Sequence, residues 1–287
     1  MCKEKTPGEL LAEELFYRTK NAGEELDAAE LARADAFCEE YKTFLDHAKI
    51  EREAVRTTVA MLEKAGYTAF DPDRSYQPGE RIYRNVRGKA LILATIGTED
   101  LEKGVRMVIS HIDSPRLDLK PNPLYEDGGL ALFKTHYYGG VKKYQWTALP
   151  LALHGTVVRK DGTVLDVVIG EDAGDPVFCV TDLLPHLAKD QMTKTLSEGI
   201  KGEQLNVVVG SRPYPDEKVK EKIKLNILSL LHEKYGLVEG DFLSAELTMV
   251  PAGAARDVGF DRSMIGSYGH DDKVCAYTSL RAAMDVA

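Results

Sequence analysis

Val108-Ile109-Ser110-His111-Ile112-Asp113-Ser114-Pro115 is the stretch from which the fold and the chemistry can be worked out. It continues the apolar run Val105-Arg106-Met107-Val108-Ile109, whose composition is typical of a strand. At a strand's end, His111 can present one ring nitrogen to a metal while Asp113 points the same way and holds the other nitrogen. The pattern indicates one half of a metal site; a hydrogen-bonded surface histidine is the alternative.

The other half of such a site must come from elsewhere, and the best candidate is Gly269-His270-Asp271-Asp272-Lys273. A carboxylate at this place can bridge two divalent metals about 3.5–4 Å apart. Aspartates also cap helices and suit the positive end of the helix dipole, so a structural role for Asp271 and Asp272 stays open. His270 is either a ligand or, in the interpretation we prefer, a neighbouring loop histidine.

The composition limits the class of protein. The chain has 287 residues, of which 44% are hydrophobic and 29% charged, as in an ordinary globular protein of about two domains. Its net charge of -9 argues against binding to nucleic-acid backbones, which select basic surfaces. No apolar stretch approaches the roughly 18 residues of a membrane span, and the N-terminus lacks the apolar core of a signal peptide. We expect a cytoplasmic protein that binds neither nucleic acid nor membrane.

The first part of the sequence combines helical and strand patterns. Residues 9–65 carry helical periodicity that stops at Gly66, and strands are expected at Arg81–Arg84 and Ala90–Thr95 as well as at Val105–Ile109. Ala90–Thr95 is almost continuously apolar, which favours a strand buried on both faces of an α/β sheet flanked by helices. The four cysteines are widely separated, which indicates buried, reduced thiols and no thiolate zinc site.

After Pro115 the sequence becomes β-rich, with a hairpin expected at Asp161-Gly162. An amphipathic helix is expected at 216–235, a strand at Phe242–Val250 and a helix from Asp272 onwards. This order of elements predicts an α/β catalytic domain interrupted by an inserted β-rich domain, and it brings residue 271 back beside residue 111. We assign residues 1–118 and 252–287 to the catalytic domain and residues 119–251 to the insertion.

Motifs of other enzyme classes are absent from the sequence. It contains no Gly-x-Ser-x-Gly, no Walker phosphate loop, no Gly-x-Gly-x-x-Gly and no His-Glu-x-x-His. The aromatic and basic cluster His136–Trp146 is the one feature that suggests RNA, but an exposed β edge or a subunit contact suits an acidic chain better.

Several separated motifs, taken in order, resemble the aspartyl aminopeptidase / aminopeptidase I family. They are Ser110–Pro115 with Leu119-Lys120-Pro121, Val250-Pro251-Ala252-Gly253, Ala255–Asp261 and Tyr268–Lys273. The resemblance implies a cytoplasmic metallo-aminopeptidase with two zinc ions per active site, which removes N-terminal residues from peptides. It also implies that the β-rich insertion drives assembly into homo-oligomers, often tetrahedral dodecamers.

The resemblance also implies roles for single residues. His111 would bind one metal, Asp113 would be the catalytic carboxylate that orients it, and Asp271 would bridge both metals. Asp272 would lie next to the bridging ligand without binding metal itself. His186, in Leu183-Leu184-Pro185-His186-Leu187-Ala188, is similar to a histidine that reaches a neighbouring subunit's active site, although a histidine packed in a loop is nearly as good an interpretation.

The family's Glu-Glu pair and its last Asp and His ligands lie downstream of these motifs, so the resemblance implies the N-terminal part of a longer enzyme. Our leading hypothesis is a zinc aminopeptidase whose preferred N-terminal residue stays open. The alternatives are a non-catalytic assembly piece of such an enzyme and a metallohydrolase acting on a non-peptide amide.

Overall fold

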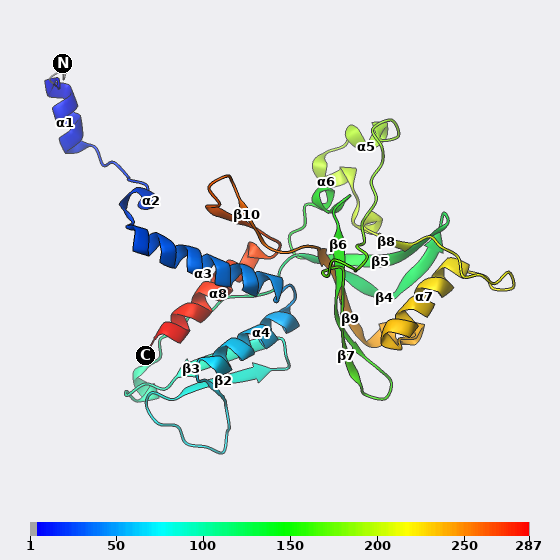
Figure 1. The fold of residues 1–287 in the computed structure, drawn as a ribbon, viewed down its shortest axis with the longest axis horizontal. Coiled ribbons are helices and arrows are strands. Elements are labelled where there is room, and N and C mark those ends of the chain that lie inside the picture. The colour runs from blue at the N-terminus through cyan, green and yellow to red at the C-terminus, as the bar shows by residue number, and fades with distance from the viewer. Residues whose placement is uncertain (1–4, 287) are drawn as a thin grey trace. The chain divides into compact units, whose positions relative to one another are not determined.

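The computed structural model describes residues 5–286, which divide into two compact units between Tyr41 and Lys42 (Figure 1). The first unit holds α1 (Pro7–Leu15), α2 (Ala22–Glu25) and most of α3 (Ala28–Asp46). Thr6 begins α1 with a capping box. The Thr6 hydroxyl accepts a hydrogen bond from the Glu9 amide, and the Glu9 carboxylate accepts one from the Thr6 amide. The helical prediction for residues 9–65 is confirmed, but breaks at 16–21, 26–27 and 47–50 divide it into separate helices.

The second unit contains a small layer of helices and strands. Helix α4 (Glu51–Lys64) is followed by β1 (Thr68–Ala69), β2 (Arg81–Val86) and β3 (Ala90–Thr95), which form a sheet in that order. Helix α8 (His270–Asp285) contributes Leu280 to a core with Leu62 of α4 and Tyr83 of β2. The last helix of the sequence therefore packs beside α4 and the β2–β3 hairpin, as Figure 1 shows.

A six-stranded antiparallel sheet forms the rest of the second unit, in the order β7-β6-β9-β4-β5-β8. This confirms the β-rich region predicted after Pro115. Because β4 starts at Arg116, the sheet crosses the domain boundary predicted at 118/119, and that division stays a prediction. The strands are β4 (Arg116–Asp127), β5 (Leu130–Tyr138), β6 (Leu151–Val158), β7 (Val164–Ile169), β8 (Val207–Gly210) and β9 (Ala245–Pro251).

The main core lies on one face of this sheet. Leu117, Phe133, Leu153 and Met249 are almost completely buried there, and one apolar side of α7 (Lys222–Tyr235) packs against them. Gly155 of β6 allows β9 to approach closely, because a Cβ at this φ of +146° would lie 1.9 Å from the carbonyl oxygen of Glu246. Close strand contact and apolar burial together hold the sheet in one register.

The β4–β5 hairpin fixes a register that matters for the site. Arg116, the first residue of β4, pairs with Tyr138, the last residue of β5. The β6–β7 hairpin predicted at Asp161-Gly162 is confirmed, with Gly162 at a φ of +85° and the Asp161 carboxylate accepting from the Thr163 amide. The remaining short elements are η1 (Leu101–Lys103), η2 (Lys143–Trp146), α5 (Lys189–Met192), α6 (Leu196–Gly199), η3 (Gly202–Gln204), η4 (Glu239–Ser244), β10 (Arg256–Val258) and β11 (Met264–Gly266).

A buried ionic cluster joins α4 to the six-stranded sheet. The His154 imidazole contacts Glu53 through Nδ1 at 2.7 Å and Glu171 through Nε2 at 2.9 Å, and Lys49 Nζ lies 2.8 Å from Glu171. Burial acts to lower the pKa of His154, but its bonds to Glu171 and Glu53 outweigh burial and raise that pKa. Burial acts to raise the pKa of Glu171, and its bonds with His154 and Lys49 lower it.

One predicted strand is absent, and another is less buried than predicted. Val105–Ile109 has no strand partner among the described residues, and its apolar side chains are 62% to 82% exposed. Pairing between strands depends on distant parts of a chain, so strand composition alone does not create a strand. Ala90–Thr95 does form β3, but it alternates exposed and half-buried residues and is not covered on both faces.

Two further elements begin later than predicted. Asp216 accepts a hydrogen bond from the Lys218 amide and Glu221 has a φ of 51°, so α7 starts only at Lys222. Residues 242–244 belong to η4 because the Asp241 carboxylate caps the Val238 amide, and β9 starts at Ala245. Cys38 and Cys275 are exposed and Cys179 is half-buried, so the prediction of buried cysteines was wrong for these three, and Cys2 lies outside the described residues. Among the described residues, no helix is long and apolar enough to cross a membrane.

Candidate metal centre

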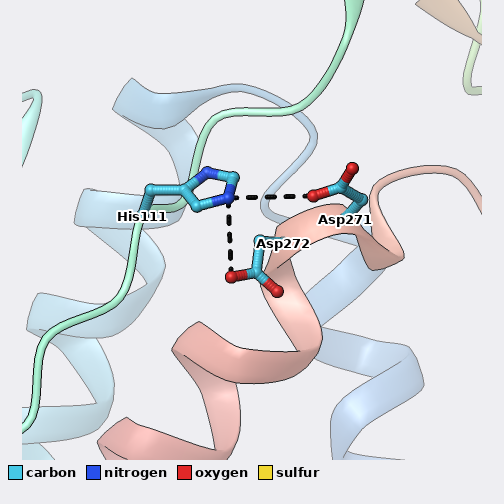
Figure 2. Close-up of side chains that lie close together, drawn as sticks. All are labelled: His111, Asp271 and Asp272. Carbon is cyan, nitrogen blue, oxygen red and sulfur yellow. Dashed lines mark ion pairs between the residues drawn. The ribbon is translucent and has the colours of Figure 1, made fainter. Parts of the chain in front are cut away.

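Three potential metal ligands meet where residues 111–113 pass the start of α8. One donor atom from each of His111, Asp271 and Asp272 lies within 4.8 Å of the others. His111 Nε2 is 3.5 Å from Asp272 Oδ2 and 3.7 Å from Asp271 Oδ1. Figure 2 shows the edge of the imidazole facing both carboxylates, which come from the first turn of the helix. The predicted return of residue 271 to residue 111 is confirmed.

The spacing of these donors suits a zinc ion. Zinc holds nitrogen and oxygen ligands at about 2.0–2.2 Å in a tetrahedral arrangement, which separates neighbouring donors by about 3.4 Å. The two separations at His111 Nε2, 3.5 and 3.7 Å, are close to that value. A mixed imidazole and carboxylate set is also a donor set that zinc prefers. The residues present therefore fit a zinc ion.

Asp113 holds the other side of the histidine ring. Its Oδ1 lies 3.2 Å from His111 Nδ1, and its Oδ2 accepts a 2.7 Å hydrogen bond from the Tyr138 hydroxyl. Burial acts to raise the pKa of Asp113, but the hydrogen bonds from Tyr138 and His111 outweigh it and lower that pKa. Asp113 is thus a carboxylate that can fix the imidazole with Nε2 directed at the donor group.

A buried lysine ties the two halves of the site together. Lys273 Nζ donates a 2.7 Å hydrogen bond to Ser114 Oγ and lies 5.3 Å from the centre of the Tyr268 ring. The Tyr268 hydroxyl in turn donates to the carbonyl oxygen of Pro115. Burial lowers the pKa of Lys273 to about 8 and raises that of Tyr268. These contacts hold residues 114–115 against the start of α8.

Comparison with known proteins decides the family. A family model described as "Aminopeptidase I zinc metalloprotease (M18)" matches residues 44–287. The chain belongs to the M18 aminopeptidase family. Its expected α/β architecture and zinc as the family's cofactor are thereby confirmed.

Several M18 relatives match most of the chain. The "Probable M18 family aminopeptidase 1" of Clostridium acetobutylicum is 49% identical over 277 residues, which cover 95% of this chain and 60% of the relative. The crystal structure of an M18 aminopeptidase from Thermotoga maritima superposes with a TM-score of 0.88 and 44% identity, covering 95% of this chain and 59% of that one. Aminopeptidase I from Borrelia burgdorferi gives a TM-score of 0.84 at 38% identity, covering 93% and 61%. This M18 chain spans about 60% of the length of these relatives.

Around the start of α8 the M18 chain departs from a regular helix. Gly269 is the residue before the first turn, and Asp271 and Asp272 have non-helical backbone angles. Gly269 occupies the N-cap, and both aspartates lie in the first turn, where the structural alternative also placed acidic side chains. Asp272 is less exposed than Asp271, 21% against 82%, and its carboxylate is the closer one to His111. Asp272 was predicted to lie next to the bridging ligand without binding metal itself. In the structure it lies within the donor group.

The other two histidines considered in the sequence lie apart from this group. His270 Nε2 contacts the carbonyl oxygen of Ile265 at 3.0 Å, in keeping with the preferred interpretation of a loop histidine. His186 is exposed in a turn before α5 and is not part of the donor group. Its contribution to a neighbouring subunit stays a prediction.

Sequence reasoning missed the side chains that support the ligands: Ser114, Arg116, Tyr138 and Lys273. Tyr138 stood inside an aromatic cluster interpreted as an exposed edge, and only the register of the β4–β5 hairpin places it beside Asp113. Lys273 gave no local signal either, because its hydrogen-bond partner Ser114 lies far away in the sequence.

Proposed function

We propose that this chain carries part of the di-zinc centre of an aminopeptidase that removes N-terminal amino acids from peptides. The single observation that carries the proposal is the donor group formed by His111, Asp271 and Asp272 inside a chain of the M18 family. In the proposed site His111 would hold one metal through Nε2, and Asp271 would supply the carboxylate between the two metals. Asp272 is the next candidate ligand because its Oδ2 is 3.5 Å from His111 Nε2.

The residues of the chain divide the work between binding and orientation. Asp113 accepts the Nδ1 proton of His111, which leaves the Nε2 lone pair for a metal. A zinc ion held by these residues would supply polarisation of the scissile carbonyl and a water whose pKa is lowered toward about 7. The 82% exposure of Asp271 leaves this carboxylate accessible from solvent, as a group that meets a peptide end must be.

Self-association is part of the proposal. A fold neighbour, the yeast aminopeptidase mApe1, is described as a dodecamer, at 18% identity and a TM-score of 0.64. We propose that residues 119–251, with the six-stranded sheet, form the assembly domain and that His186 reaches a neighbouring subunit from it.

A second candidate function has its own support. Because the chain spans about 60% of its relatives, it would serve as an assembly piece if the remaining part supplies indispensable ligands. Both functions predict oligomers, and they differ in hydrolysis.

Zinc binding and peptidase activity of residues 1–287 separate these outcomes. We expect calorimetry to show zinc binding that His111→Ala abolishes and that the matched change at an exposed histidine, His47→Ala, leaves intact. Hydrolysis of aminoacyl anilides together with zinc binding supports the enzyme, and zinc binding in oligomers without hydrolysis supports the assembly piece. A wild-type chain that binds no zinc refutes the enzyme, and a wild-type chain that stays monomeric refutes the assembly piece.

A further inference from the structure

The inserted sheet reaches the candidate metal centre through one hydroxyl group. Tyr138, the last residue of β5, donates a 2.7 Å hydrogen bond to Asp113 Oδ2. The other oxygen of the same carboxylate, Oδ1, faces His111 Nδ1 at 3.2 Å. Each oxygen of Asp113 thus has its own partner, and the two bonds together define the plane of the carboxylate.

The tyrosine ring is itself held in place. Arg116 stands directly opposite Tyr138 in the β4–β5 register, and its guanidinium carbon lies 4.4 Å from the centre of the ring. Arg116 is fixed by Glu51 at 2.5 Å and by Asp118 at 2.7 Å, and its side chain is only 14% exposed. Stacking of a guanidinium on an aromatic face restricts the ring to one orientation, so the hydroxyl has a defined position.

Without the hydroxyl, Asp113 would have one partner fewer. A carboxylate with one partner can rotate about its Cβ–Cγ bond and present either oxygen, or neither, to the imidazole. A metal-binding histidine depends on such a carboxylate for its tautomer and ring orientation, and losing an outer partner typically weakens metal binding 10–100-fold.

We propose that Tyr138 is a positioning residue that locks Asp113, and through it holds His111 in the Nδ1–H tautomer with Nε2 free to bind a metal. This inference rests on the proposed function, because that function makes His111 a ligand. It adds a role for the six-stranded sheet. The pair Arg116 and Tyr138 of the β4–β5 hairpin sets the orientation of His111, which lies outside the sheet.

The first test needs no metal. Nitrogen-15 NMR of the imidazole in alkaline buffer distinguishes the two neutral tautomers of His111 in the full chain. We expect the Nδ1–H form in the wild type and a shift toward the Nε2–H form in Tyr138→Phe, which keeps the ring over Arg116. Tyr137→Phe is the matched control, because within residues 5–286 no hydrogen bond of its hydroxyl occurs. An unchanged tautomer in Tyr138→Phe overturns the proposal.

The second test measures coupling. Cobalt(II) or zinc affinity is determined for the wild type, Tyr138→Phe, Asp113→Asn and the double variant, with melting curves to compare folding. We expect Tyr138→Phe to weaken binding about 10–100-fold, and to have little further effect once Asp113 is changed. Additive losses would mean that Tyr138 acts independently of Asp113, which contradicts the proposal. A wild type that binds no metal refutes the proposed function, while the tautomer of His111 still decides the role of Tyr138. If Tyr138→Phe does not fold, Asp113→Asn supplies the tautomer readout: an unchanged His111 tautomer in that variant overturns the proposal.

Discussion

Lys273 Nζ donates a hydrogen bond to Ser114 Oγ at 2.7 Å, and both side chains are buried. The bond joins the segment that carries His111 to the helix that carries Asp271 and Asp272. Burial of an ammonium group is costly unless its protons find partners, so this contact matters more than its single hydrogen bond suggests. It explains how two distant segments stay close enough to bring His111 and the two aspartates together.

Ser114→Ala should therefore destabilise the fold more than a surface serine would. We expect the free energy of unfolding to fall by at least about 2 kcal/mol, because the buried ammonium loses its acceptor. Lys273→Met added to Ser114→Ala should recover part of the loss, since the uncompensated charge is then gone. Urea denaturation measures each value, and the exposed Ser110→Ala is the control. Equal effects of Ser114→Ala and Ser110→Ala would contradict this view.

Asp272→Asn should weaken zinc binding, although the sequence analysis did not assign this residue as a metal ligand. Its Oδ2 is 3.5 Å from His111 Nε2, so we expect at least about a tenfold loss of affinity by calorimetry. Zinc at about 100 times its Kd should add about 2.7 kcal/mol to the wild-type free energy of unfolding, and a chelator should remove this gain. Asp190→Asn, in the exposed α5, should bind zinc like the wild type; equal affinity in Asp272→Asn would exclude it as a ligand.

His154→Leu should be strongly destabilising in mildly acidic solution, by about 3–5 kcal/mol, because the Glu53 and Glu171 carboxylates lose the imidazolium between them. The pKa of His154 is raised above its ordinary 6.5, so its stabilisation is complete below pH 6.5 and is lost as the pH rises through the folded-state value. The pKa of Glu171 is lowered from 4.5, so its stabilisation is present above pH 4.5 and is lost at lower pH.

The difference in the free energy of unfolding between wild type and His154→Leu should hence become smaller on going from about pH 6 to about pH 9. Denaturation curves at several pH values measure it, with the exposed His47→Leu as a control that stays within about 0.5 kcal/mol of wild type. A difference that does not change with pH would show that His154 is not charged in the fold.

Gly155→Ala should cost at least about 3 kcal/mol, because the new methyl group would meet the Glu246 carbonyl at 1.9 Å and force β6 and β9 apart. Gly129→Ala is the matched comparison: its φ is +79° with nothing within 4 Å, so it should cost only the 1–2 kcal/mol or so of a left-handed backbone. Thermal unfolding of both variants measures the gap. Similar melting temperatures would mean that the strands are not closely packed at this rung.

The sequence predicted the parts of the fold that depend on local patterns. The hairpin at Asp161-Gly162, the strands at Arg81 and Ala90 and the C-terminal helix follow from turn chemistry and periodicity, which nearby residues determine. The starts of helices were less predictable. The Asp216 carboxylate accepts a hydrogen bond from the Lys218 amide and Glu221 has a positive φ, and both features prevent α7 from starting at residue 216.

Of the candidate site, only the residues that stand in short metal-binding motifs could be predicted from the sequence. His111, Asp113 and Asp271 stand in short motifs whose residue types already indicate metal chemistry. Tyr138, Arg116 and Ser114 support them through contacts between distant segments, and no local pattern encodes such contacts. Asp272 lies with His111 and Asp271 because the backbone here is not helical, whereas adjacent residues of a regular helix point in different directions; its role at the metal stays a prediction.

The uncovered run Val105–Ile109 has a consequence for the behaviour of the purified chain. Its valines, methionine and isoleucine form a short segment of high β-propensity with exposed side chains, and unpaired strands of this kind recruit other chains. Concentrated samples should cloud or sediment, and Val108→Lys should keep them clear by light scattering, because it adds a second charge to a segment that has only Arg106. The solubility of the purified chain should thus depend on five residues that lie just before the candidate metal ligand His111.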